Sequence, residues 1–211
     1  IRHTESNRPV RKKEVLHAAV NFAVSNEGTT APMLCLINQR YWNCPMNIRD
    51  ADGLAPIHIA VKGRKDDVVQ VLLEAGADGY ITSIPDDITP LHLLAEGSGT
   101  LDMMRQILDR PRTVSLDEKT ARGNTALHLA AKQNEVSRVE ILLLAGANPF
   151  VENLVHETPL RWATGYIVDL VDGRQTSAST DLLDLVAKMV EQYITAVDVK
   201  TRQDRALAFG S

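Results

Sequence analysis

Three histidines recur at a regular interval and are the first candidates for chemistry in this sequence. His58, His92 and His128 lie 34 and then 36 residues apart, each after a proline- or alanine-led apolar pair. Histidines bind zinc at ~2.0–2.1 Å, so the nitrogens of one site must converge. Equivalent positions in stacked helical layers are instead separated by ~8–10 Å. We therefore expect each histidine to hydrogen-bond within its own repeat, and we predict no metal site.

Other residues that could support catalysis do not form a complete arrangement. Ser98 lies directly between two glycines, whereas a Gly-x-Ser-x-Gly elbow needs them two residues to either side. The pairs Asp66-Asp67 and Asp86-Asp87 fall at an expected helix start and in an expected turn, where carboxylates are favourable locally. The sequence has no Gly-x-x-x-x-Gly-Lys phosphate loop. It therefore predicts no catalytic residues, no cofactor and no enzyme activity.

The histidines belong to a four-residue segment that occurs four times. Steps of 34, 36 and 33 residues separate the third positions of the copies. A step of about 33 residues is typical of stacked copies of one supersecondary unit. The copies are Ala55-Pro56-Ile57-His58, Thr89-Pro90-Leu91-His92, Thr125-Ala126-Leu127-His128 and Thr158-Pro159-Leu160-Arg161.

Residues 50–82 form the clearest unit and predict two short helices. The first begins at Pro56, which suits a first helical turn, and extends to about Val61. The second covers about 66–75, with Val68, Val69, Leu72 and Leu73 on one apolar face. Gly76 follows, and glycine readily takes the left-handed conformation that ends helices. The sequence thus predicts an all-α architecture of stacked helix-turn-helix units.

Composition and charge restrict the partner and the compartment. The net charge of -4 gives no broad attraction to nucleic acid, so we expect no direct nucleic-acid binding. The apolar run Ile141–Ala147 is far shorter than the ~18 residues of a membrane span, so we expect no membrane insertion. Cys35 and Cys44 are expected to be reduced thiols, which favours a cytoplasmic location with the nucleus as the alternative. Because the chain starts at Ile1, we expect a fragment of a longer protein.

These residues resemble the ankyrin-repeat family. The motif of a turn, Gly, Thr-Pro-Leu-His-x-Ala, Val-Val-x-x-Leu-Leu and Gly-Ala-Asp is matched in the unit 50–82, from Asp50 to Gly76-Ala77-Asp78. It is matched again from Gly123 to Gly146-Ala147-Asn148. The resemblance implies a solenoid of about five repeats with short hairpin loops. The irregular third unit is also reminiscent of the inhibitor-of-NF-κB branch.

The expected organisation is a repeat domain between two short terminal segments. Residues 1–13 are a basic lead-in, which is either a solvated segment or a nuclear-import or anionic-surface patch. The repeat domain covers 14–195, with a turn-rich insertion near 172–180 and a C-terminal capping helix from about Asp181. A tail follows at 196–211. The repeats are placed near 14–49, 50–82, 83–116, 117–152 and 153–195.

The resemblance implies a non-enzymatic module that binds a protein or peptide on a concave face and takes no small-molecule substrate. The alternatives are the targeting arm of a larger enzyme and an inhibitor-of-NF-κB-like regulator. Tyr41-Trp42 is a further possible anchor, whereas Met103 and Met104 are expected to fill the core and Trp162 is expected to be packed. The residues carried over to the concave face are Asp52, Leu54, Lys62, Arg64, Asp86, Ile88, Glu96, Arg122, Asn124, Lys132, Gln133, Val155, Glu157 and Tyr166.

Overall fold

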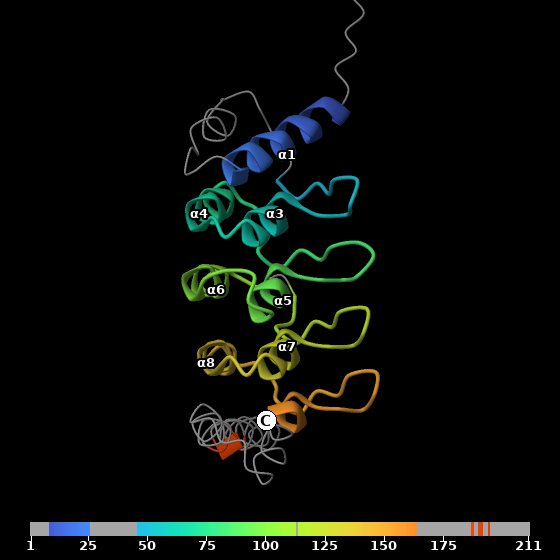
Figure 1. Cartoon of the computed structure of the whole chain (residues 1–211), viewed down its shortest axis with the longest axis vertical. Coiled ribbons are helices and arrows are strands. Elements are labelled where there is room, and N and C mark those ends of the chain that lie inside the picture. The colour runs from blue at the N-terminus through green and yellow to red at the C-terminus, as the bar shows by residue number, and fades with distance from the viewer. Residues whose placement is uncertain are drawn as a thin grey trace, which may run out of the picture.

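Pairs of short helices stack along one axis in the computed structural model (Figure 1). The structure describes residues 9–25, 46–112, 114–163 and positions 187, 190, 191 and 194. Its helices are α1 (Pro9–Ser25), α3 (Pro56–Lys62), α4 (Asp66–Glu74), α5 (Pro90–Ala95), α6 (Leu101–Leu108), α7 (Ala126–Lys132) and α8 (Val136–Leu144). Residues 159–163 are also helical. The expected all-α solenoid is confirmed.

The helices form two parallel columns. The inner column contains α3, α5 and α7, the outer column contains α4, α6 and α8, and α1 lies across α3 at one end (Figure 1). Helices of the same column contact one another from repeat to repeat. Each repeat therefore buries its apolar side chains mainly against its two neighbours, as in other solenoids.

The apolar face predicted for 66–75 is confirmed, since Val68, Val69, Leu72 and Leu73 are all buried. Met103 and Met104 are fully buried in α6, also as expected. Gly76 has a φ of +90° after α4, and the amide of Ala77 donates to the Leu72 carbonyl at 2.9 Å. This hydrogen bond satisfies a carbonyl at the helix end and turns the chain toward the next hairpin.

The start of each inner helix depends on the residue before it. Thr89 and Thr125 cap α5 and α7, because their hydroxyl oxygens accept from the amides of His92 and His128. Ala55 precedes α3 and provides no side-chain cap. A missing hydroxyl cap costs a helix ~1 kcal/mol, so α3 is the weakest of the three starts.

Hairpins connect each outer helix to the next inner helix and project from the inner column (Figure 1). The Ser83 amide donates to the Ile88 carbonyl at 2.8 Å to close one hairpin. The Ile84 amide donates to the Gly53 carbonyl of the preceding hairpin at 3.1 Å, and the Ala121 amide donates to the Asp86 carbonyl at 2.9 Å. Backbone hydrogen bonds thus join successive hairpins, which fixes their spacing along the stack.

Arg138 is an unusual member of the interior. It occupies α8 and is only 8% exposed. Its guanidinium donates to the carbonyl of Leu94 at the end of α5 and, at 3.0 Å, to the carbonyl of Gly99. Glu135 lies 3.6 Å from its Nε. The buried cation therefore connects the repeat of α7 and α8 to the preceding repeat through backbone acceptors.

Several expected features fall at the ends. The helix α1 begins at Pro9, so the last part of the expected lead-in 1–13 is helical. Of the apolar positions that recur at helical spacing in α1, Leu16, Ala19, Val20 and Ala23 are buried, whereas Val15 is 39% exposed. Outside the described residues lie the expected second helix of the first repeat, Tyr41-Trp42, the 172–180 insertion, the tail 196–211 and most of the capping helix, of which positions 187, 190, 191 and 194 are helical.

Candidate partner-binding face

A row of histidines runs from α1 through the inner column and connects each repeat to the next. Each ring Nε2 lies within hydrogen-bond distance of a hairpin carbonyl: His17 of Leu54, His58 of Ile88, His92 of Asn124 and His128 of Glu157, at 3.2, 2.9, 3.1 and 2.9 Å. A carbonyl only accepts, so each Nε2 donates. The expectation that each histidine bonds within its own repeat was therefore incomplete, because these bonds reach the following hairpin.

The other ring nitrogen serves the histidine's own repeat. The amides of Ala55, Thr89 and Thr125 each donate to Nδ1 of the histidine three residues later, at 3.1 Å. Burial lowers the pKa of His58 and His128, and lowers the pKa of His92 to about 4. The three rings are thus neutral near pH 7 and hold backbone groups on both sides. Among the described residues, no group of three or more His, Cys, Asp or Glu side chains is arranged to bind a metal ion.

The histidine row positions the first set of predicted partner-binding residues. The four acceptor residues Leu54, Ile88, Asn124 and Glu157 are half-buried. The residue two positions before each acceptor residue has an exposed side chain. Each of these four exposed residues is followed by a residue in the left-handed conformation, with φ between +52° and +79°, which turns the hairpin back toward the inner column. They are Asp52, Asp86, Arg122 and Val155.

A second set lies at the ends of the inner helices. Lys62, Glu96 and Lys132 each follow the N-cap residue by seven positions and are exposed. Arg64 is exposed, has a φ of +55°, and donates to the Gly97 carbonyl of the next repeat at 2.8 Å. Gln133 is exposed at the end of α7. Side chains of opposite sign therefore alternate along the helix ends.

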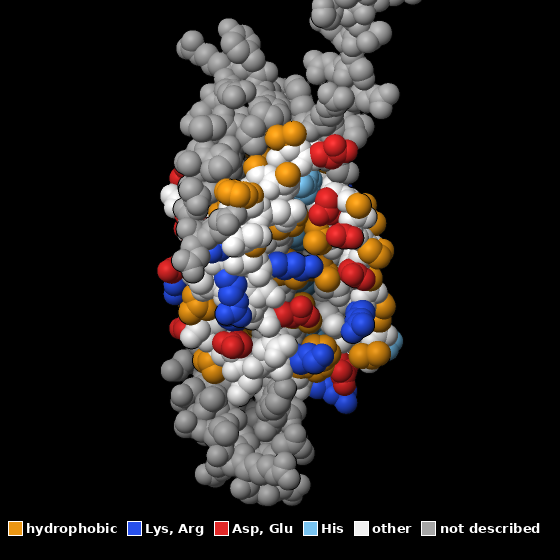
Figure 2. Space-filling view, turned by 45° about the horizontal axis from the view of Figure 1, so that its top comes forward, with side chains coloured by type: hydrophobic (Ala, Val, Ile, Leu, Met, Phe, Trp, Pro, Cys, Tyr) orange, Lys and Arg blue, Asp and Glu red, His pale blue; other side chains and the backbone are white. Residues whose placement is uncertain are grey.

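The hairpins and the exposed sides of α3, α5 and α7 together form the surface that we call the concave face. It contains two adjacent hollows. The first, of about 250 Å³, is lined by Asp52, Leu54 and Lys62 on one repeat and by Asp86 and Ile88 on the next. Figure 2 shows acidic, basic and hydrophobic side chains interspersed over the molecule's visible face.

The second hollow, of about 270 Å³, continues the first, and the two share Asp86 and Ile88. It brings together six of the predicted residues: Asp86, Ile88, Glu96, Arg122, Asn124 and Lys132. Arg64, Gln133, Val155 and Glu157 do not line either hollow, and Tyr166 lies outside the described residues.

Trp162 packs against the hydrophobic core, as expected from the sequence, but part of its side chain stays at the surface. It is half-buried, and its ring lies 5.9 Å from the Lys132 ammonium and packs edge-on against His128. Its Nε1 donates to the carboxylate of Glu157 at 2.5 Å. Aligning the repeats on the N-cap places Trp162 in register with Leu93 and Leu129, which line the hollows. This alignment could have indicated from the sequence alone that Trp162 lies beside the concave face.

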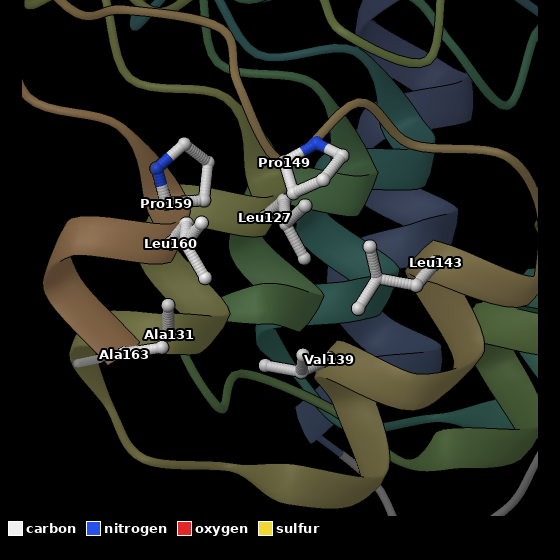
Figure 3. A pocket seen from close by; sticks show the side chains of 8 residues that line it. All are labelled: Leu127, Ala131, Val139, Leu143, Pro149, Pro159, Leu160 and Ala163. Carbon is white, nitrogen blue, oxygen red and sulfur yellow. The ribbon is translucent and has the colours of Figure 1, made fainter. Parts of the chain in front are cut away.

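A third space lies away from the concave face, between α7, α8 and residues 159–163 (Figure 3). Its side chains are all apolar and point toward one another, and its volume is only about 10 Å³. That volume is at the lower limit for one water molecule. The space is therefore part of the packing between repeats and not a ligand site. Its walls are Leu127, Ala131, Val139, Leu143, Pro149, Pro159, Leu160 and Ala163.

Comparison with known proteins agrees with this geometry. Residues 79–153 match the family described as "Ankyrin repeats (3 copies)", and residues 52–84 match "Ankyrin repeat". The chain belongs to the ankyrin-repeat family. The matched residues contain α3 to α8 and both hollows of the ankyrin concave face. Ankyrin repeats mediate binding of protein partners, which agrees with the general function expected from the sequence.

Alignments with three individual relatives cover a larger part of this ankyrin chain than the two family models do. They cover less than half of each relative's own length. A "Putative ankyrin repeat protein FPV031" of Fowlpox virus is 34% identical over 162 residues, which is 76% of this chain and 42% of the relative. A "B-cell lymphoma 3 protein homolog" of Mus musculus is 25% identical over 77% of this chain and 36% of its own. The "Transient receptor potential channel pyrexia" of Drosophila melanogaster is 30% identical over 59% of this chain, only 13% of the channel. Among the described residues, no helix is long and apolar enough to cross a membrane.

Proposed function

We propose that this chain is a non-enzymatic interaction module that binds a protein or peptide partner in the two hollows of its concave face. A scaffolding or regulatory role follows from such binding. The observation that supports this proposal is the convergence of residues from three repeats on one continuous surface. Most of the residues that line it vary between repeats. The repeated histidines, of which His92 reaches the second hollow, hold the hairpins in place.

The character of the surface favours a macromolecular partner of mixed charge. Acidic and basic side chains share the same hollows, with half-buried Leu54 and Ile88 between them. Protein interfaces combine apolar contacts with a polar rim in this way, whereas small-molecule pockets are more enclosed and mostly apolar. The acidic side chains Asp52, Asp86 and Glu96 would repel a phosphate backbone, which argues against nucleic acid.

Two alternatives remain as hypotheses. In the first, this chain is the targeting arm of a larger enzyme, and the support is that it spans only 13–42% of the three relatives described above. In the second, it is an inhibitor-of-NF-κB-like regulator. The support is the irregular unit 83–116, because the step from its motif to the next is 36 residues, against 34 and 33 for the other two steps. Capture of a Rel-like domain would favour the second alternative. We propose a cytoplasmic location with the nucleus as the alternative, which imaging of the tagged full-length protein would test.

Charge reversal tests the proposed surface. In the double variant Arg122→Glu/Lys132→Glu, both basic side chains of the second hollow become acidic. Affinity capture from the source cell followed by mass spectrometry should lose the partners recovered with the unchanged chain. The melting temperature should change little, because both side chains are exposed and the lost contact of Lys132 with Trp162 costs about 0.5–1 kcal/mol.

The matched control is Arg105→Glu/Arg110→Glu, which reverses two exposed basic residues of the outer column. Arg105 lies in α6 and Arg110 lies two residues after its end. This control should capture the same partners as the unchanged chain. Unchanged capture by the Arg122/Lys132 variant would exclude the concave face as the binding surface.

A further inference from the structure

The two walls of the second hollow come from neighbouring repeats and carry opposite charge. Asp86 and Glu96 belong to the repeat of α5 and α6, and Arg122 and Lys132 belong to the repeat of α7 and α8. All four side chains are exposed. The hollow is therefore polarised along the axis of the stack, with an acidic side followed by a basic side.

Three of these four charges are not neutralised by an ion pair across the hollow. Within the part of the chain that the structure describes, Asp86, Glu96 and Arg122 form no ion pair. The hollow of about 270 Å³ separates the two walls, and its floor includes half-buried Ile88 and buried Leu129. A partner could thus meet the acidic wall, the apolar floor and the basic wall in turn.

The spacing of the walls restricts the shape of that partner. Neighbouring inner helices pack ~8–10 Å apart, so the two walls are offset by about that distance along the stack. A polyproline II segment rises ~3.1 Å per residue and has three residues per turn. Side chains three residues apart in such a segment point the same way and are separated by ~9 Å, which matches one repeat.

We infer that the second hollow binds an extended peptide segment that carries one basic and one acidic side chain three residues apart. The basic side chain lies against Asp86 and Glu96, and the acidic side chain lies against Arg122 and Lys132. This inference rests on the proposed function and adds the chemistry of the partner to it. Reversing one wall removes favourable pairing and adds like-charge repulsion, so affinity should fall by about tenfold.

Four phage-displayed peptide libraries test the inference directly on the full chain. Each library holds random 12-residue peptides in which positions 5 and 8 are fixed as Lys/Glu, Glu/Lys, Lys/Lys or Glu/Glu. The unchanged chain should enrich at least one mixed-charge library over both like-charge libraries by about tenfold. The variant Arg122→Glu/Lys132→Glu makes both walls acidic and should enrich the Lys/Lys library instead.

Two further variants keep the experiment decisive. Arg105→Glu/Arg110→Glu should keep the preference for mixed charge, and Arg122→Gln/Lys132→Gln should reduce it without adding acidic groups to the fold. Equal enrichment of like-charge libraries by the unchanged chain, or an unchanged preference in the Arg122→Glu/Lys132→Glu variant, would overturn the inference. If one of these two results were found but the Arg122→Glu/Lys132→Glu variant still lost its cell-derived partners, only the inference about peptide charge would be rejected. The proposed function would still be supported. Undiminished capture of those partners would reject the proposed function itself.

Discussion

Acidification should destabilise this protein because its inner column depends on neutral histidines. His92 is 2% exposed, donates from Nε2 to the Asn124 carbonyl, and accepts at Nδ1 from the Thr89 amide. A proton on Nδ1 would remove that acceptor and place a charge in the interior. Burial accordingly lowers the pKa of His92 from 6.5 to about 4.

The sign and size of the effect follow from proton linkage. Above pH 6.5 both the folded and the unfolded states are neutral at His92, so its full contribution to stability is present. As the pH falls from 6.5 toward 4, the unfolded chain takes up a proton that the folded chain does not, and stability is lost. With these pKa values, His92 alone should cost about 2 kcal/mol of unfolding free energy between about pH 7.5 and about pH 5. His58 and His128 act in the same direction, because burial lowers the pKa of each.

Urea unfolding, followed by circular dichroism at a series of pH values from about 7.5 to about 5, measures this loss. That range lies above the ordinary pKa values of ~3.9 and ~4.3 for Asp and Glu, so most carboxylates do not contribute. The variant His92→Gln should be less stable at pH 7.5 and should show a shallower dependence on pH. A constant unfolding free energy from pH 7.5 to 5 would refute the reasoning, as would NMR titration of the folded His92 ring near pH 6.5.

Three substitutions in the scaffold test the remaining energetic arguments. Ala55→Thr should stabilise the protein by ~1 kcal/mol in urea unfolding, because it supplies the N-cap hydroxyl that α3 lacks. Thr125→Ala should destabilise the protein by a similar amount, because it removes the N-cap of α7. Destabilisation by Ala55→Thr would show that the buried site has no room for a hydroxyl. Arg138→Met keeps the bulk of the side chain but removes the donors to the Leu94 and Gly99 carbonyls, and should cost ~2 kcal/mol. An unchanged urea midpoint for Arg138→Met would mean that water or other groups satisfy those carbonyls.

Much of the fold followed from local patterns in the sequence. The 33–36-residue step fixed the number and order of the central repeats, since identical local signals produce identical supersecondary units. The bounds of α4 and the burial of its apolar face agreed with helical spacing. The glycine at 76 ended a helix as expected, with a φ of +90°. These features depend on residues close together in the chain, which is why the sequence alone predicts them.

The candidate site was predicted only in outline. Aligning the repeats selects Asp86 and Arg122 as equivalent positions, but it does not show that they face each other across one hollow. Trp162 packs against the core as expected, but the sequence did not predict that it would lie half-buried beside Lys132. The sequence shows that Trp162 occupies the same position in its repeat as Leu129 does. It does not show how exposed the Trp162 side chain is, because that depends on the neighbouring residues that cover it.

The sequence by itself determined the repeating unit, the helix-starting threonines, the turn glycines and the recurring histidines, because each is a short-range signal within about 33 residues. Only the tertiary structure decided what the histidines do. Each ring holds its own helix start through Nδ1 and the next hairpin through Nε2, as His58 does with Ala55 and Ile88. The second contact spans 30 residues and exists only after the repeats stack. Stacking also creates the polarised hollow, since its acidic and basic walls belong to different repeats.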